Sequence, residues 1–286
     1  MAKQETPFFS IVIPVLNEEK ALPSLLSDLA HQTINDFEVI IVDGHSDDRT
    51  VEKALEWKSR LPSINVVPCK IRNVSVQRNL GAEKSTGKYI LFNDSDNNLP
   101  KYFLEGIRYQ LRIKPVDTFT VWCDADTNKR SDKTIAIYLN LLVETAFLLG
   151  NPAAFGAMIG CRKNKFSKTG GFDPKVGFAE DTEFVRQAHK KGCTFGVFHE
   201  PRYVYSLRRF RKIGMLKAVK DYAILNLKYL TKQPVDQKKE YPMGGDLFSD
   251  TKTAEIFNKV DGSFKKLLKK PKILDKISAL LSLEEK

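Results

Sequence analysis

Two aspartates that stand two positions apart, Asp94 and Asp96, are the residues of this sequence best suited to hold a divalent cation. They follow a hydrophobic run, and charged groups at the end of a buried strand need a partner. Mg²⁺ and Mn²⁺ suit this role, because these hard ions prefer carboxylate, water and phosphate oxygens. We therefore expect Asp94 and Asp96 to bind Mn²⁺ or Mg²⁺, although the same triplet also occurs in ordinary surface turns.

A second acidic group, made of Glu180, Asp181 and Glu183, stands at the start of a predicted helix. Negative charge at a helix start interacts favourably with the helix dipole, which is a purely structural interpretation. A carboxylate in this place could instead act as a general base that takes a proton from an attacking hydroxyl. The motif alone leaves both interpretations open.

The elements that must position these groups alternate between strands and helices. Apolar runs predict strands at 8–13, 38–42, 64–67 and 88–92. Apolar spacing and composition predict helices between them, over 22–29, from about 48, and over 79–85. This alternation implies an α/β fold with a mostly parallel sheet, in which ligands bind outside the carboxyl ends of the strands. Asp43, Asp94 and Asp96 all stand at such ends.

The pattern changes beyond Pro100. It predicts helices near 102–112, 139–149 and 182–191, and strands at 119–123 and 194–198. The most apolar stretch, Leu141 to Gly160, is interrupted by Glu144 and by Asn151-Pro152, so no membrane-spanning helix is predicted. We expect an apolar helix packed on the core, or the hydrophobic wall of a cleft.

Charge and cysteine content narrow the class of protein. The chain has 286 residues and a net charge of +11, and its basic excess lies in Arg202–Glu240 and Lys259–Lys286. Such an excess would suit nucleic acid, an anionic membrane or phosphate-rich small molecules. No basic–aromatic platform supports nucleic acid, so no nucleic acid is expected. The four cysteines form no Cys-x-x-Cys pair and no secretory signal begins the chain, so we predict a cytoplasmic protein with reduced thiols.

Five segments resemble, in the right order, motifs of the family 2 inverting glycosyltransferases. They are Ser10–Glu19, Ile40–Thr50, Gln77–Ala82, Tyr89–Asp96, and Gly170–Asp173 followed by Glu180-Asp181. The resemblance covers about residues 8–215 and implies a Rossmann-like GT-A fold, whose mostly parallel central sheet is flanked by helices. It implies a GT-A domain at 7–232, with a nucleotide-binding half of about 7–100 and an acceptor half of about 101–232. Residues 233–286 would form a polar, basic extension with amphipathic helices.

The resemblance also implies a role for each matching position. The positions that would bind the nucleotide sugar are Pro14, Glu18, Asp43, Arg78, Asp94, Arg208 and Arg209. Glu18 would contact the ribose and Asp43 the base, and Arg208 or Arg209 would contact the diphosphate. Asp96, with Asp94, would ligate the metal, and Asp181 would be the catalytic base.

The activity implied is metal-dependent, inverting transfer of a sugar from a nucleoside diphosphate sugar to an acceptor hydroxyl, in glycan, glycolipid or polysaccharide synthesis. A UDP-sugar is favoured and a GDP-sugar stays open, as does the acceptor, either a saccharide or a lipid-linked group. The basic C-terminal stretch would either pack on the domain or bring the enzyme to an anionic membrane on the cytoplasmic face. A nucleotidyltransferase is the alternative enzyme, but its glycine-rich phosphate loop is missing after the first strand. A non-catalytic basic binder of membranes or nucleic acid is the other alternative.

Several positions depart from the family pattern. Gly44 stands where many members carry a second Asp, although the family also contains Asp-Gly forms. Asn97 replaces a frequent third Asp, and the residues after Asp96 differ from those of dolichyl-phosphate mannose synthases, which weighs against a polyprenyl-phosphate acceptor. His199 is either a further metal ligand or a structural residue.

Overall fold

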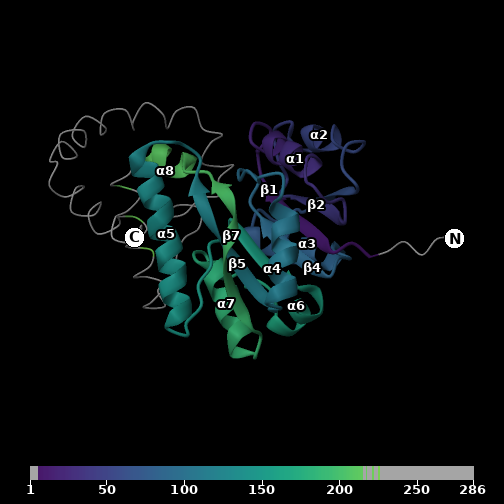
Figure 1. The fold of residues 1–286 in the computed structure, drawn as a ribbon. Helices are drawn as coiled ribbons and strands as arrows, with labels where there is room; N and C mark the ends of the chain where they lie inside the picture. The colour runs from purple at the N-terminus through teal and green to yellow at the C-terminus, as the bar shows by residue number, and fades with distance from the viewer. Residues whose placement is uncertain (1–5, 215–216, 218–220, 222–224, 226–286) are drawn as a thin grey trace. The chain divides into compact units, whose positions relative to one another are not determined.

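The computed structural model describes residues 6–214 together with 217, 221 and 225. Up to Leu207 the described residues belong to one compact unit, and Arg208 begins a second unit. The strands are β1 (Phe9–Val15), β2 (Phe37–Asp43), β3 (Ile64–Pro68), β4 (Tyr89–Asn93), β5 (Thr118–Ala125), β6 (Met158–Arg162) and β7 (Phe195–Tyr205) (Figure 1). The helices are α1 (Leu22–Ala30), α2 (Thr50–Leu55), α3 (Val74–Lys84), α4 (Phe103–Ile113), α5 (Arg130–Leu148), α6 (Lys163–Thr169), α7 (Glu180–Lys190) and α8 (Arg208–Ile213). The predicted extension at 233–286 lies outside the described residues.

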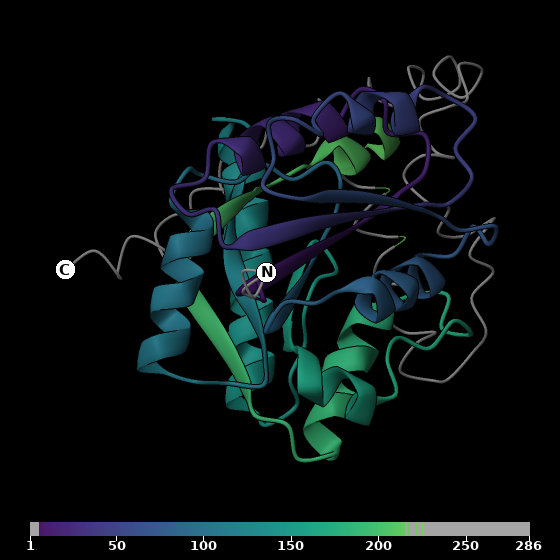
Figure 2. The same cartoon turned by 90° about the vertical axis from the view of Figure 1, so that its right-hand side faces the viewer.

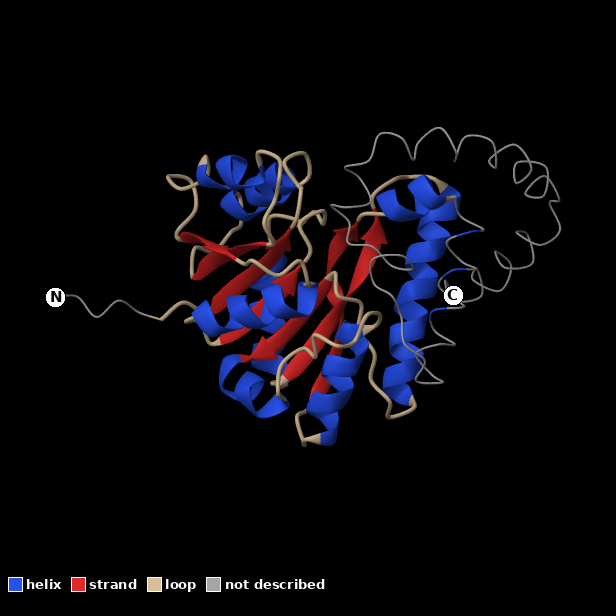
Figure 3. Ribbon diagram, turned by 180° about the vertical axis from the view of Figure 1, so that it is seen from behind, coloured by secondary structure: helices blue, strands red, loops and turns tan. Residues whose placement is uncertain are grey.

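The strands form one seven-stranded sheet in the order β3-β2-β1-β4-β6-β5-β7. Figure 3 shows the strands in red beside the blue helices that flank them. Only β6 runs antiparallel to its neighbours, β4 and β5, whereas the other pairs are parallel. The prediction of a mostly parallel sheet is therefore confirmed. In the register of the first strands Val15 lies opposite Asp43 and Val12 opposite Phe92, so β1, β2 and β4 end at the same edge of the sheet.

Helices cover both faces of the sheet (Figure 2). Successive side chains of a strand point to opposite faces, and β1 follows this rule: Ile11 and Ile13 belong to one apolar cluster and Val12 to the other. The first cluster includes residues of α1 and α4, and the second includes Ala82 of α3, Phe184 of α7 and Phe172. The two clusters lie on the two faces of the sheet, whereas the loops lie at the carboxyl ends of its strands.

The observed elements differ from the predicted ones in length. Helix α3 starts five residues before the predicted start because the side chain of Asn73 caps it, accepting from the Val76 N–H at 3.0 Å. Strand β7 runs on to Tyr205, so the basic stretch that begins at Arg202 is partly strand. Local apolar patterns place an element better than they place its ends.

The apolar stretch Leu141–Gly160 does not form one helix packed on the core. Helix α5 ends at Leu148, and the chain returns through a loop to β6, a strand that the sequence did not predict. The side chains of α5 that are buried are Asp132, Ala136, Asn140 and Val143, whereas Leu141, Leu142, Leu148 and Leu149 are exposed. A short apolar run fits a buried strand as well as a helix, which explains the error. Helix α6 was missed as well.

Helix α5 is tied to the sheet by a polar side chain. Where β5 and β7 shift register between Val121 and Cys123, Asn140 accepts from the Cys123 N–H and donates to the Cys123 carbonyl, both at 2.9 Å. These two bonds satisfy backbone groups that the irregular ladder would leave buried and unpaired. Within the described ranges no helix has both the length and the hydrophobicity that crossing a membrane requires.

Candidate active site

The loops that follow β1 and β2 are held together by hydrogen bonds. The N–H of Asn17 donates to the Ser46 hydroxyl at 2.9 Å, and the N–H of Glu18 donates to the Thr50 hydroxyl at 2.8 Å. Ser46 in turn donates its hydroxyl to Asp43 Oδ1 at 2.5 Å. The two loops predicted to receive the nucleoside are thus ordered by the chain's own contacts. Pro14 lies within β1 at the same edge of the sheet.

Glu18 and Asp43, the residues predicted to contact the ribose and the base, are 6% and 7% exposed. Gln77, which the sequence reasoning passed over, lies beneath the same edge on α3 and is fully buried. Its amide nitrogen donates to the carbonyls of Val15 and Val42 at 2.9 and 2.8 Å. A polar residue in a buried stretch of helix is the signal that would have found it.

Arg78 lies at the centre of the candidate site, between the two acidic groups. Its guanidinium donates to Asp94 Oδ1 at 3.0 Å, to Glu180 Oε1 at 2.9 Å and to the Gly156 carbonyl at 3.1 Å. Burial lowers the pKa of Arg78, but the charges of Asp94 and Glu180 outweigh that effect and raise it. Arg78 therefore stays charged and joins two motifs that lie far apart in the chain.

The structure adds protein contacts to the role expected of Arg78. The side chain is 2% exposed and its guanidinium packs 5.2 Å from the ring centroid of Phe172. Both terminal nitrogens of its guanidinium donate to protein groups, whereas the buried Nε has no hydrogen-bond partner among the described residues. That Arg78 lines the nucleotide pocket stays a prediction. The sequence pattern could place Arg78 near the site but could not show which groups it would meet.

Asp181, the predicted base, stands in the first turn of α7. One carboxylate oxygen accepts from the Gly156 N–H and the other from the Thr182 N–H. Burial, together with the neighbouring charge of Glu180, raises the pKa of Asp181 to about 7, although Arg78 opposes the rise. A carboxylate with a pKa near neutrality is suited to accept a proton from a substrate.

Asp94 and Asp96 follow β4 and are both partly exposed. Arg78 occupies Oδ1 of Asp94, while Oδ2 has no hydrogen bond or ion pair within residues 6–214. In that same part of the chain no three His, Cys, Asp or Glu residues come together as a metal site. Two carboxylates still fit Mg²⁺ or Mn²⁺, because such ions commonly take one or two carboxylates and complete their shell with substrate phosphates and water.

Other predicted residues lie elsewhere. His199 is engaged by protein groups: its Nε2 lies 3.0 Å from Glu144 Oε2 and its ring lies 4.2 Å from that of Trp122. This favours the structural interpretation of His199. Arg208 and Arg209 stand on α8, in the second compact unit, and their contact with a diphosphate stays a prediction.

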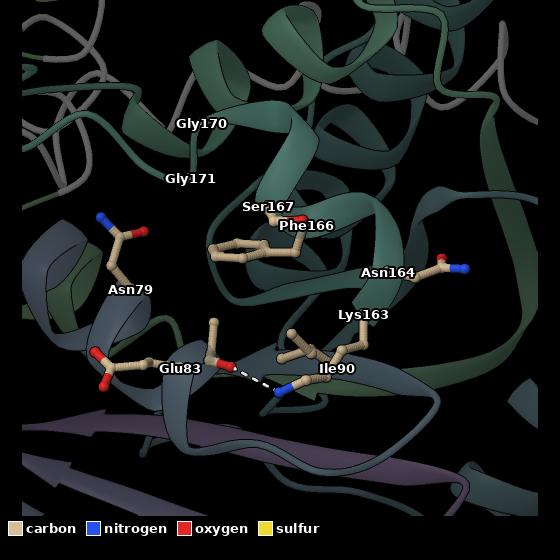
Figure 4. A pocket seen from close by; sticks show the side chains of 10 residues that line it. Asn79, Glu83, Ile90, Lys163, Asn164, Phe166, Ser167, Gly170 and Gly171 are labelled. Carbon is tan, nitrogen blue, oxygen red and sulfur yellow. Dashed lines mark hydrogen bonds between the residues drawn. The ribbon is translucent and has the colours of Figure 1, made fainter.

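A pocket of about 710 Å³ lies between α3 and α6 (Figure 4). It is lined by Asn79, Ala82, Glu83, Ile90, Lys163, Asn164, Phe166, Ser167, Gly170 and Gly171. Lys163 borders it and donates to the Ala82 carbonyl at 3.2 Å, which ties its ammonium to the last turns of α3. None of the predicted site residues lines this pocket, so it is separate from the site at the carboxyl edge of the sheet.

The mostly parallel sheet flanked by helices is the arrangement of the GT-A fold. Residues 10–170 match the model of glycosyl transferase family 2, which is more than half of the chain. The chain therefore belongs to glycosyl transferase family 2.

Two curated relatives are also glycosyltransferases by name. An uncharacterized glycosyltransferase of Haemophilus influenzae is 28% identical over 179 residues, which make up 62% of this chain and 60% of the relative. A PGL/p-HBAD biosynthesis glycosyltransferase of Mycobacterium bovis is 36% identical over 94 residues, or 32% of this chain and 37% of the relative. The chain thus spans less than two thirds of the length of each.

Solved structures share the fold at low sequence identity. The mannosyltransferase PcManGT from Pyrobaculum calidifontis, in complex with GDP-Man and Mn²⁺, superposes with a TM-score of 0.62 at 16% identity, covering 99% of this chain and 82% of that one. Residues 1–349 of TarS from S. aureus, in complex with UDP-GlcNAc, give a TM-score of 0.59 at 19% identity, covering 81% and 69%. These likenesses show the fold.

Proposed function

We propose that this chain is a metal-dependent, inverting glycosyltransferase that moves a sugar from a nucleoside diphosphate sugar to an acceptor hydroxyl. The observation that carries the proposal is the position of Arg78, whose guanidinium bonds Asp94 on the donor side and Glu180 beside the predicted base. A transferase needs its leaving-group site and its base at a set separation, because the acceptor must attack in line with the departing diphosphate. The buried arginine supplies that constraint.

The proposed reaction is a single displacement. Asp181 accepts the proton of the acceptor hydroxyl, whose oxygen bonds to the anomeric carbon as the bond from that carbon to the diphosphate oxygen breaks. Attack from the opposite face inverts the anomeric centre. Asp94 and Asp96 would hold a divalent cation, which when bound would supply positive charge for the departing nucleoside diphosphate.

The donor we favour is a UDP-sugar, with a GDP-sugar as the alternative. Support comes from the two solved neighbours, whose structures contain UDP-GlcNAc and GDP-Man with Mn²⁺. We propose a saccharide or lipid-linked acceptor, and a cytoplasmic enzyme that reaches anionic membranes through its basic C-terminal region. The boundary of the transferase domain at 232 remains part of the same proposal.

The test is calorimetric titration of UDP and of GDP, each with and without Mn²⁺, into the wild type and Asp96→Asn. Asp124→Asn is the matched control, because Asp124 also stands near the end of a strand but pairs with the partly exposed Arg202 at 3.2 Å. We expect one of the two nucleotides to bind in the presence of Mn²⁺. Its affinity should be at least tenfold lower without Mn²⁺ or in Asp96→Asn, and it should be unchanged in Asp124→Asn. Binding that ignores both Mn²⁺ and Asp96 would contradict the metal role. No binding of either nucleotide by the folded protein would contradict the function.

A further inference from the structure

Gln77 connects the carboxyl ends of the two strands that precede the nucleotide loops. Its side chain is fully buried, and its amide nitrogen donates to Val15 O at 2.9 Å and to Val42 O at 2.8 Å. A carboxamide donates only through its nitrogen, so two carbonyl partners decide which way the amide faces. One side chain of α3 thus holds the last residue of β1 and the next-to-last residue of β2.

Both contacts lie immediately before residues of the candidate site. Val15 precedes the loop that contains Glu18, and Val42 precedes Asp43. The Val15 carbonyl also accepts from the Gly44 N–H at 2.8 Å, so it receives donors from α3 and from the second loop. A substitution at Gln77 would therefore alter the backbone positions of Val15 and Val42, the strand residues from which the two loops continue.

The absence of a side chain at Gly44 leaves room for the amide of Gln77. A Cβ at Gly44 would lie 3.0 Å from the Gln77 amide nitrogen and 3.2 Å from the Val15 carbonyl oxygen, which is tighter than most contacts of real Cβ atoms.

We propose that Gln77 is a positioning residue for the donor nucleotide, acting through the two loops, and that Gly44 is the partner that leaves room for it. The proposal rests on the proposed function, because the loops matter only if they bind a nucleotide. The amide does not touch the donor. It holds the backbone from which Glu18 and Asp43 project.

The first test compares Gln77→Met with Gln32→Met, since methionine keeps much of the volume and removes the donors. Gln32 is the matched control because it is also buried and its amide also donates to two carbonyls, those of Asp28 and Pro100, both at 3.0 Å. We expect both variants to lower the melting temperature by similar amounts. Only Gln77→Met should weaken nucleotide binding, by tenfold or more. Unchanged affinity in the folded Gln77→Met protein would overturn the proposal.

Amide hydrogen exchange tests the same idea without any nucleotide. Peptides that cover residues 16–21 and 44–49 should exchange faster in Gln77→Met than in the wild type or in Gln32→Met. Unchanged exchange in both peptides would overturn the proposal even if the wild type binds a nucleotide. If the wild type binds neither UDP nor GDP, the proposed function fails by itself, and the exchange result still shows whether Gln77 holds the loops.

A double-mutant cycle tests the partnership with Gly44. Gly44→Ala should weaken nucleotide binding in the wild-type background, because the new Cβ displaces the amide. In the Gln77→Ala background the same change should cost less, because only the Val15 carbonyl then crowds the new Cβ, so the two losses should not multiply. Losses that multiply would show independent positions and overturn the partnership.

Discussion

At the scale of single residues, the candidate site depends on one buried, positively charged side chain, that of Arg78. Arg78 is 2% exposed and contacts a carboxylate that is 36% exposed, Asp94, and one that is 10% exposed, Glu180. Removing one partner of a buried ion pair costs far more than the pair contributes, because the remaining charge stays desolvated. Arg78 is therefore expected to matter for stability as well as for the geometry of the site.

Arg78→Met should lower the free energy of unfolding by about 3 kcal/mol, since it leaves two acidic groups without their cation. Arg202→Met is the matched control, because Arg202 also contacts two carboxylates, Asp124 and Glu200, but is 35% exposed. An exposed pair contributes about 1 kcal/mol or less. Urea denaturation at neutral pH measures both variants. Equal losses would contradict the role of burial.

Asp181 gives the site a dependence on pH. Its pKa is about 7 in the folded chain, against about 4 for an unperturbed aspartate. Between these values the folded protein keeps a proton that the unfolded chain has lost, so stability falls as the pH rises towards 7. The asparagine of Asp181→Asn does not titrate, so the variant does not lose this stability. The unfolding free energy of the variant minus that of the wild type should therefore increase by at least about 1 kcal/mol from pH 4 to pH 8.

Denaturation of the two proteins across this pH range measures the gain, and a constant difference would show that the carboxyl group titrates normally. The same group should control catalysis with the opposite dependence on pH. Nucleoside diphosphate release from the donor should rise as the pH passes about 7, since the base acts only when it has lost its proton. Asp181→Asn should abolish the rise while leaving nucleotide affinity within about threefold.

At the scale of elements, α3 organises the candidate site. Three consecutive residues project from it in different directions: Gln77 towards β1 and β2, Arg78 towards β4 and α7, and Asn79 towards the glycine turn. Successive helical residues are about 100° apart, so one turn can serve three neighbours. Gly81 lets this helix approach β1, because a Cβ there would lie 2.2 Å from a Val12 methyl.

Gly171 is expected to be less tolerant of alanine than Gly192. Both have positive φ, at 72° and 82°, which costs an L-residue roughly 1–2 kcal/mol. A Cβ at Gly171 would also lie 2.6 Å from Asn79 Oδ1, whereas nothing lies within 4 Å of one at Gly192. Asn79 Oδ1 accepts the Phe172 N–H at 2.9 Å, so displacing it loosens the turn before α7.

Thermal unfolding of Gly171→Ala and Gly192→Ala makes this comparison. The first should lose about 1 kcal/mol or more beyond the second, because breaking one hydrogen bond to a buried group is of that size. Equal losses would mean that Asn79 moves aside at no cost and does not hold the turn.

At the scale of the whole molecule, charge is distributed unevenly along the sequence. The chain carries +11, and residues Lys259–Lys286 contribute eight lysines against four acidic residues. Each basic residue near an anionic membrane contributes about 1 kcal/mol to binding, and salt weakens the attraction. This part of the sequence lies outside the described residues, so the argument rests on composition.

Deleting the chain after Gly262 should lower the fraction of protein that pellets with anionic vesicles, and raised salt should lower it further for the full chain. Neutral vesicles are the control and should pellet neither protein. If the truncated chain pellets with anionic vesicles as well as the full one does, the membrane role of the C-terminal stretch is wrong.

Local sequence patterns predicted the strands β1 to β5, the start of β7, the mostly parallel sheet and the carboxyl edge at which Asp43, Asp94 and Asp96 lie. They could do so because the spacing of apolar residues depends on the local secondary structure and on which face of it is buried. The motifs also pointed to Glu180 and Asp181, whose assignment as a base stays a prediction.

Tertiary structure decided the features that depend on distant partners. Strand β6 became a strand because it fits between β4 and β5, where Gly160 leaves room for Phe119. Arg78 turned inward because carboxylates from two separate segments converge on it, and Gln77 found carbonyls at the ends of two strands. A side chain's partners across a sheet are set by packing and register, and no local pattern carries that information.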